Sequence, residues 1–238
     1  MMSLHGRIDS RGQRGFTLVE LLVVVAVVGV LVGLVLSGAA RVRHGSKVAA
    51  SLQNLRHLAQ FASSYAEDAR GAFPASQHSA VARGQLPWEY IYFGEVEGTR
   101  DTPAPTDPRL HAFIDSYCRS PLDPRQGDPL LRRFPSYGQN VYFELGPEET
   151  GGPTWPRLAR IPLPARTVLY GELEDASVAD HIMAHFWTAY GAPPEVAVDR
   201  NRPGCGCAFV DGHVENLLFE QTFTPQAGVN LWNPQTAR

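Results

Sequence analysis

Twenty consecutive residues without a charged side chain, from Leu21 to Ala40, constrain this chain more than any other feature. Valine and leucine dominate the run. A helix of that length spans roughly 30 Å, which is the thickness of the hydrocarbon core of a bilayer. Charged residues make up only 19% of the 238 residues, and the apolar excess is concentrated here. The run therefore predicts a helix that spans a membrane, beginning near Phe16.

The flanks of this run indicate which end faces the cytoplasm. The first 15 residues are polar and contain three arginines, and basic residues favour the cytoplasmic side of a membrane. On the other side stand Arg41, Arg43 and Lys47, which weaken that preference. We expect a cytoplasmic N-terminus, a single membrane span and an extracytoplasmic C-terminal domain.

One acidic residue, Glu20, stands at the start of the apolar segment. A carboxylate inside an apolar helix is costly and is by default functional, with a partner of positive charge. A cut between Gly15 and Phe16 would create a free amine on Phe16, and this amine could serve as the partner for Glu20 of a neighbouring subunit. The alternative is that Glu20 lies at the level of the lipid headgroups and has no further role.

The segment Gly15-Phe16-Thr17-Leu18-Val19-Glu20, with its basic leader and apolar run, resembles the class III signal of type IV pilins and type II secretion pseudopilins. The resemblance implies that a prepilin peptidase cuts between Gly15 and Phe16 and then N-methylates Phe16. It also implies that Glu20, the fifth residue of the mature chain, sets the register between subunits during assembly.

Cleavage by an ordinary signal peptidase is the competing interpretation of this segment. The small residues Ser37-Gly38-Ala39-Ala40 would suit such an enzyme. However, the apolar run is longer than the core of a usual signal peptide, which has about 7–15 residues, and Glu20 would have no role in it. We therefore expect the prepilin-type cut after Gly15.

Beyond Ala40 the apolar residues become periodic, which predicts that the helix continues. They recur at three- and four-residue steps along one face, at Val48, Leu52, Leu55, Ala59, Ala62 and Ala66. Gly71 and Pro74 are stop signals, so we expect one helix from about residue 17 to about residue 69. The chain then divides into a leader (1–15), a transmembrane and assembly helix (16–40), its amphipathic continuation (41–70) and an extracytoplasmic globular domain (71–238).

The distal residues 71–238 predict an α+β domain that is rich in loops. Most of the 19 prolines and 22 glycines occur there, which favours short regular elements. Residues 136–143 and 166–172 have the composition of strands, and Asp211-Gly212 between the apolar runs 207–210 and 213–217 predicts a hairpin. We expect the long helix to pack on a small antiparallel sheet in a pilin-like arrangement.

The distal domain carries a second resemblance, to the H-x9-DG domain that accompanies prepilin-type N-termini. Four segments follow one another in the order of that domain: 118–123, 136–140, 167–172 and 209–213. Its name-giving histidine would stand ten residues before Asp211, where this chain has Asn201. A role of that histidine is therefore not carried over to this chain.

The three cysteines, Cys118, Cys205 and Cys207, leave two alternatives open. Outside the cytoplasm, where the resemblance places them, a bridge from Cys118 to Cys205 or Cys207 could persist, with one thiol left over. Alternatively, all three are small buried residues.

No pattern in the sequence predicts catalysis, a metal site or a cofactor. His181 and His185 have the spacing of two ligands on one helix face, but Ile182 stands where a zinc protease needs glutamate. Several acids could form a calcium site, although solvated turns are the simpler interpretation: Asp123, Asp128, Glu144 and Glu148 or Glu149. The net charge of −3 gives no reason to expect nucleic-acid binding.

The leading hypothesis is a non-enzymatic structural subunit of a type II secretion pseudopilus or of a type IV pilus-like filament. The resemblance implies three partners: the prepilin peptidase, other pilin-like subunits that contact the N-terminal helix, and the inner membrane, with the C-terminal domain in the periplasm. The alternative is a membrane-anchored extracytoplasmic binding module that is processed in the same way but does not polymerise.

Overall fold

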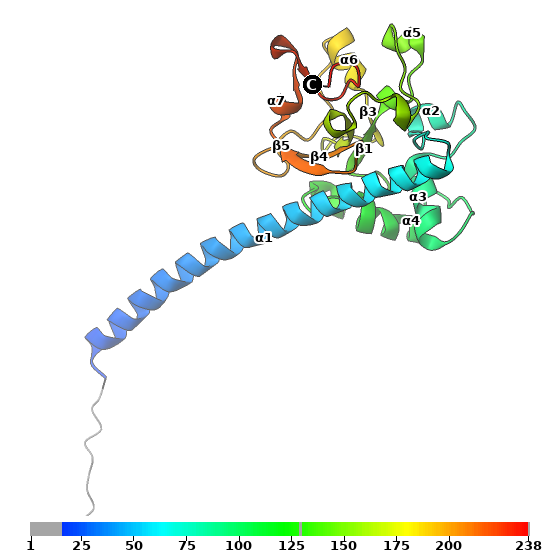
Figure 1. The fold of residues 1–238 in the computed structure, drawn as a ribbon. Coiled ribbons are helices and arrows are strands. Elements are labelled where there is room, and N and C mark those ends of the chain that lie inside the picture. The colour runs from blue at the N-terminus through cyan, green and yellow to red at the C-terminus, as the bar shows by residue number, and fades with distance from the viewer. Residues whose placement is uncertain (1–15, 129, 238) are drawn as a thin grey trace, which may run out of the picture. The chain divides into compact units, whose positions relative to one another are not determined.

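The computed structural model describes residues 16–128 and 130–237, so the leader lies outside the described residues. The chain divides into two compact units, the first ending at Gly45 and the second beginning at Ser46. The first unit contains the start of helix α1 (Leu18–Asp68), and the second contains the rest of α1 and the α+β domain (Figure 1).

The long helix α1 confirms the prediction almost to the residue, with 51 residues from Leu18 to Asp68. The C-terminal end of α1 is capped by a backbone hydrogen bond. Arg70 and Gly71 have φ values of 56° and 87°, and the Gly71 N–H donates to the carbonyl of Ala66 at 2.7 Å. This is the hydrogen bond of a Schellman motif, which satisfies a carbonyl that the last helical turn leaves free. The left-handed position before Gly71 is held by an arginine.

The second unit is built on a five-stranded sheet with the strand order β3-β1-β2-β4-β5. Its strands are β1 (Tyr137–Asn140), β2 (Val168–Glu172), β3 (His181–Ile182), β4 (Cys205–Phe209) and β5 (Val214–Leu217). The predicted α+β class is confirmed, but the sheet is mixed and not purely antiparallel, because β1 and β3 run parallel. The chain crosses from β2 to the far side of β1, and such a crossover leaves no periodic signal in the sequence.

The predicted hairpin is confirmed as β4 and β5, joined through Asp211-Gly212. Gly212 has a φ of 92°, which favours glycine at this turn. The strand expected at residues 136–143 is shorter than predicted. It ends at Asn140, whose side chain accepts a hydrogen bond from the Tyr142 N–H and starts the short helix η3 (Val141–Phe143).

Short helices and a two-stranded sheet cover the five-stranded sheet and its edges. The helices are α2 (Gln77–Ala80), α3 (Trp88–Glu97), α4 (Pro108–Phe113), α5 (Pro147–Thr150), α6 (Ala184–Ala189) and α7 (Phe219–Thr222), with a π-turn η1 (Ile114–Cys118) and 3₁₀ turns η2 (Pro124–Gly127), η4 (Leu158–Arg160), η5 (Pro164–Arg166) and η6 (Pro225–Ala227). The small sheet pairs β6 (Phe223–Thr224) with β7 (Val229–Asn230).

Within the second unit, α1 lies between the sheet and the helices α3 and α4 (Figure 1). Leu55 and Leu58 are fully buried, and Leu55 lies against Gly206 of β4, where a side chain would collide with it. On the other side, the ring of Phe61 stacks on Tyr92 of α3 at a centroid distance of 4.6 Å. The periodic face that the sequence predicted is therefore the face that packs.

A buried carboxylate joins this part of α1 to the sheet. Glu172 of β2 is 0% exposed. Its Oε1 accepts a hydrogen bond from the Ser51 hydroxyl at 2.6 Å, and its Oε2 accepts one from the Gly206 N–H at 2.8 Å. The Ser51 hydroxyl also lies 3.0 Å from that of Tyr137. Burial raises the pKa of Glu172, and both of its oxygens depend on these donors.

Candidate processing and assembly site

The predicted site lies at the start of α1, in the first unit. Gly15, which precedes the expected cut, lies outside the described residues, so the observable site begins at Phe16. The Phe16 side chain is 78% exposed, and it stands two residues before the first helical residue, Leu18. The residue expected to carry the new amine is therefore open to contact from outside the chain.

Thr17 and Glu20 form a reciprocal cap on the helix start. The Glu20 N–H donates to the Thr17 hydroxyl oxygen at 3.2 Å. In return, Oε2 of Glu20 accepts hydrogen bonds from the Thr17 N–H at 2.8 Å and from its hydroxyl at 2.9 Å. This is a capping box, which satisfies backbone donors that the first helical turn leaves free.

The cap gives Glu20 a role that the sequence analysis did not assign. The signal was present as Thr17-x-x-Glu20, which is the sequence pattern of a capping box. Only Oε2 of the carboxylate takes part in the cap, and among the described residues Oε1 has no hydrogen-bond donor. Glu20 is exposed. One of its oxygens can therefore cap its own helix while the other accepts a hydrogen bond from a cationic group of another chain.

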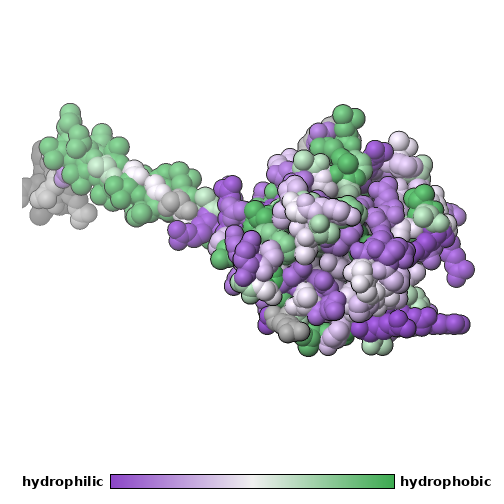
Figure 2. Space-filling model, turned by 90° about the horizontal axis from the view of Figure 1, so that it is seen from above, coloured by the Kyte–Doolittle hydropathy of each residue, from purple (hydrophilic) through white to green (hydrophobic). Residues whose placement is uncertain are grey.

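The rest of this unit presents an apolar surface. The leucine and valine side chains from Leu18 to Leu36 are 50–80% exposed, and the face seen in Figure 2 is almost entirely hydrophobic along this segment. By length and composition, α1 is able to cross a membrane. Water is a poor solvent for such a surface, so its burial in lipid or against other protein is favourable.

Two glycines in the apolar run, Gly29 and Gly33, are not required by the chain's own packing. A Cβ atom added at either position meets nothing within 4 Å. Glycines at this four-residue spacing let the backbone of another helix approach closely. The spacing would therefore suit the close approach of a helix from a second chain.

The sequence left two alternatives open for the cysteines, a bridge from Cys118 or three buried thiols. Cys118, Cys205 and Cys207 are free and buried. Gly206 faces Leu55 of α1, so its strand neighbours Cys205 and Cys207 point to the opposite side of the sheet. Cys118 lies on the α1 side, near Tyr170. The sheet itself thus separates Cys118 from the other two, and the alternative of three buried thiols describes the structure.

Neither of the considered metal sets converges on one point. His181 lies in β3 and His185 in α6, so the two do not share a helix face. Within residues 16–128 and 130–237 no group of three or more histidine, cysteine, aspartate or glutamate side chains could hold a metal ion.

Two of the acids considered for calcium, Glu144 and Asp123, are engaged elsewhere. Glu144 accepts hydrogen bonds from the Ser76 N–H and the Ser79 hydroxyl. Asp123 forms an ion pair with Arg125 at 2.7 Å. Burial alone would raise the pKa of Asp123, but hydrogen bonds from Arg125 and Ser136 hold it at about 2.

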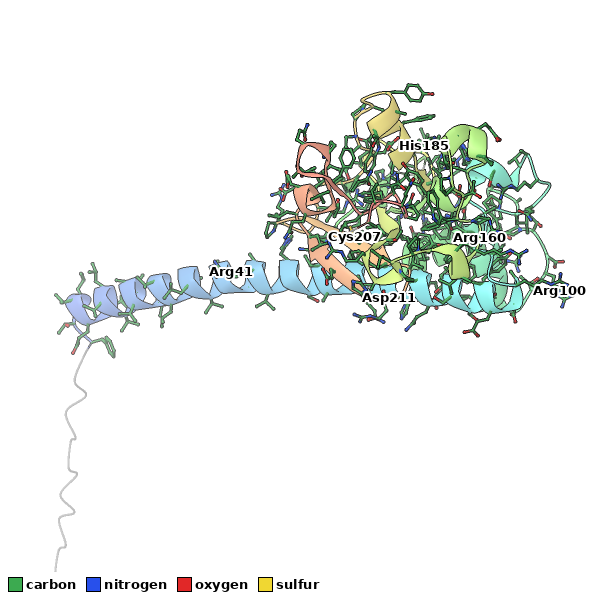
Figure 3. All side chains as sticks on the ribbon, turned by 45° about the horizontal axis from the view of Figure 1, so that its top comes forward. Arg41, Arg100, Arg160, His185, Cys207 and Asp211 are labelled. Atoms are coloured by element: carbon green, nitrogen blue, oxygen red, sulfur yellow. The ribbon has the colours of Figure 1, made fainter. Side chains whose placement is uncertain are left out.

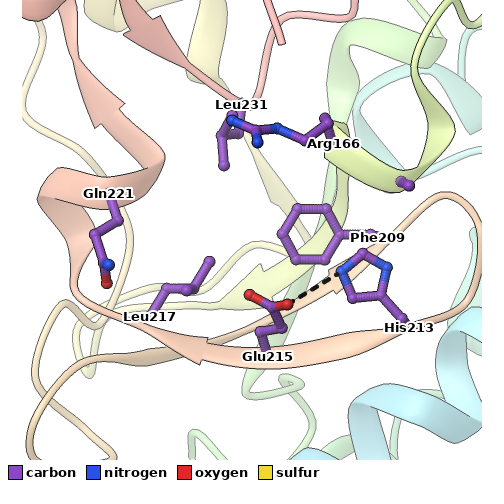
Figure 4. Close-up of a pocket in the computed structure, with 8 residues that line it drawn as sticks. Arg166, Phe209, His213, Glu215, Leu217, Gln221 and Leu231 are labelled. Atoms are coloured by element: carbon purple, nitrogen blue, oxygen red, sulfur yellow. Dashed lines mark ion pairs between the residues drawn. The ribbon is translucent and has the colours of Figure 1, made fainter. Parts of the chain in front are cut away.

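The Asp211-Gly212-His213 turn borders a cleft of about 250 Å³ beside β5 (Figure 4). The His213 ring stacks on Phe209 at 4.2 Å, and its Nδ1 lies 2.5 Å from Oδ1 of Asp211. The cleft is lined by Ala165, Arg166, Phe209, His213, Glu215, Leu217, Gln221 and Leu231.

Asn201, at the position of the expected histidine, is only 2% exposed and precedes β4, whereas Asp211 follows it. The length of β4 separates the two, so Asn201 does not line this cleft. Membership of the H-x9-DG family stays a prediction.

Comparison with known proteins bears on the first unit. The family model of the prokaryotic N-terminal methylation motif matches residues 10–36. No curated protein and no solved structure matches the chain. The matched segment contains the predicted cut, the Thr17–Glu20 cap and most of the apolar run. It supports a type IV pilin-like precursor that undergoes prepilin-type processing, and the apolar helix fits a single-pass membrane anchor.

Proposed function

We propose that the chain is a structural subunit of a pilus-like filament, either a type II secretion pseudopilus or a type IV pilus. A prepilin peptidase of the inner membrane cuts it after Gly15 and N-methylates Phe16, and its domain faces the periplasm. The observation that carries the proposal is the coincidence, within residues 10–36, of the methylation motif with an exposed carboxylate at the head of an uncovered apolar helix.

The chemistry of assembly follows from the state of Glu20. Cleavage leaves a positively charged amine on Phe16, and methylation keeps that charge. Oε2 of Glu20 already closes its own helix, which leaves Oε1 for the amine of a neighbouring subunit. In a water-poor environment such a pair attracts strongly, and leaving one partner alone costs about 3–5 kcal/mol.

The ion pair supplies what the apolar surface lacks, namely a defined register. Lipid tails are as apolar as leucine and valine, so the apolar side chains do not by themselves determine where one helix stops against the next. A single carboxylate at one end and a single amine four residues before it give each pair of subunits one favourable offset. The proposed role is structural and needs no catalytic residue.

Three variants separate the two roles of Glu20. Glu20→Gln retains a side chain that can close the capping box but removes the charge, whereas Glu20→Ala removes both. Glu67→Ala is the matched control, because Glu67 is an exposed acid near the other end of α1. We expect the two Glu20 variants to be cleaved normally by intact mass, yet to enter sheared filaments at least a hundredfold less than the wild type, and Glu67→Ala to be incorporated normally.

Each other outcome has a defined meaning. If Glu20→Gln assembles normally and Glu20→Ala does not, the cap alone matters and the ion pair is refuted. If wild-type protein is cut and methylated but stays with the cells after shearing, the protein is a membrane-anchored binding module. A mature N-terminus at Ala40 or Arg41, found by N-terminal sequencing, would refute prepilin-type processing altogether.

A further inference from the structure

Two arginines, Arg41 and Arg43, follow the apolar run directly and have no acidic neighbour along the helix. No aspartate or glutamate occurs between Glu20 and Glu67, so no acid lies three or four residues from either arginine, where it could reach along the helix. Within residues 16–128 and 130–237, neither arginine forms an ion pair. Both side chains are exposed, and Figure 3 labels Arg41 on this part of α1.

The two arginines point to nearly opposite sides of the helix. Each residue turns an α-helix by about 100°, so positions two apart differ by about 200°. A folded partner that touches one face of α1 would reach only one of the two guanidinium groups. A layer of anionic groups that surrounds the helix would reach both.

The depth of the two residues identifies that layer. The uncharged residues Leu21–Ala40 are long enough as a helix to cross roughly 30 Å of hydrocarbon. If Glu20 lies at one surface of the bilayer, Arg41 therefore lies in the opposite headgroup region. Arginine extends its charged end toward the interface and binds phosphate oxygens in a bidentate manner. The chemistry therefore matches the phosphates of acidic phospholipids.

We infer that Arg41 and Arg43 bind the headgroups of anionic phospholipids in the leaflet that faces the C-terminal domain. This inference rests on the proposed membrane-anchored precursor and adds to it. The leader arginines Arg7, Arg11 and Arg14 leave with the leader when the chain is cut after Gly15. From then on Arg41 and Arg43 are the arginines directly beside the membrane span. A subunit that enters a filament must then replace its contacts to these lipids by contacts to protein.

The test measures the lipids that stay with the full chain. Wild type, Arg41→Gln/Arg43→Gln and Arg56→Gln are each reconstituted in vesicles of equal parts phosphatidylglycerol and phosphatidylcholine, extracted in mild detergent, and analysed for retained lipid by mass spectrometry. Arg56 is the matched control, since it is another exposed arginine of α1 but lies in the second unit and contacts Gln53. Glutamine preserves helix propensity.

We expect wild type and Arg56→Gln to retain phosphatidylglycerol in preference to phosphatidylcholine. Each basic residue near an anionic surface is worth roughly a fivefold preference, so the double variant should lose about 25-fold. Arg41→Lys/Arg43→Lys should restore part of it. Equal retention of both lipids by wild type, or an unchanged preference in the double variant, overturns the inference.

The lipid test and the proposed function fail separately. Intact mass shows beforehand whether each sample has been cut after Gly15. If the leader is retained, it is present in wild type and variants alike, so it does not change the difference in lipid preference between them. Failure of cleavage or of filament entry would refute the proposed function and leave the lipid result standing.

Discussion

The two halves of α1 belong to one helix and yet have opposite relations to their surroundings. From Leu18 to Leu36, the leucine and valine side chains are at least half exposed, whereas Leu55, Leu58, Ala59 and Ala62 of the second unit are 0% exposed. The first half is apolar on every side, and its side chains stay exposed among the described residues. The second half is apolar on one face and finds its partner in the sheet and α3. Apolar content alone therefore does not predict burial within a chain; the angular distribution of apolar residues decides it.

The largest expected effect comes from a charge on the packed half. Leu58→Asp places a carboxylate among fully buried side chains, and we expect a loss of more than 4 kcal/mol in the free energy of unfolding, enough to prevent the domain from folding. Thermal unfolding of the detergent-solubilised chain, followed by near-ultraviolet circular dichroism, measures the loss.

The same substitution in the other half is the control. Val30→Asp should leave the melting temperature of the domain unchanged, because Val30 is 64% exposed and lies in the first unit. It should instead reduce the membrane-bound fraction, since an acid at the centre of a spanning helix costs about 2.5–3.5 kcal/mol. A domain destabilised by Val30→Asp would show that the two halves are not independent.

A moderate effect is expected where the packed half is tied to the sheet. Glu172→Gln places an amide where two hydrogen-bond donors converge, so one donor loses its acceptor at a cost of about 1–3 kcal/mol. The variant also changes the pH dependence. Because the pKa of Glu172 is raised in the folded state, its contribution to stability is fully present below the ordinary glutamate pKa and falls as pH rises through the raised value.

Replacement by glutamine removes that titration. Unfolding by denaturant at several pH values should therefore show a smaller decline in stability between acidic and neutral pH for the variant than for wild type. Identical pH profiles would mean that Glu172 has the same pKa in the folded and the unfolded chain.

The smallest effect is expected at the start of the exposed half. Thr17→Ala removes the hydroxyl of the capping box, which is worth about 1 kcal/mol of local helix stability. Faster amide hydrogen exchange in residues 18–21 would report the loss, with no change in the melting temperature of the domain. Thr17→Ser retains the hydroxyl and should behave as wild type. Unchanged exchange in the alanine variant would show that the cap does not hold the first turn.

Much of the candidate site could be predicted from the sequence, because its features are local. The motif around Gly15 and Phe16 and the apolar run from Leu21 to Ala40 lie within a few turns of chain. Glu20 was singled out for its charge, whereas its cap was missed although Thr17-x-x-Glu20 carries the pattern. The cap satisfies backbone donors of the first helical turn, and the cost of a charge in an apolar segment does not reveal them.

The features that only the tertiary structure decided depend on residues far apart in the chain. The parallel pairing of β1 with β3, the separation of Cys118 from Cys207 by the sheet and the burial of Glu172 between Ser51 and Gly206 all depend on which segments meet. The sequence by itself determined the long helix, its apolar run and the Asp211-Gly212 hairpin, because hydrogen bonds and periodicity between near neighbours specify them. Long-range pairings depend on the packing of the whole core, which no local pattern encodes.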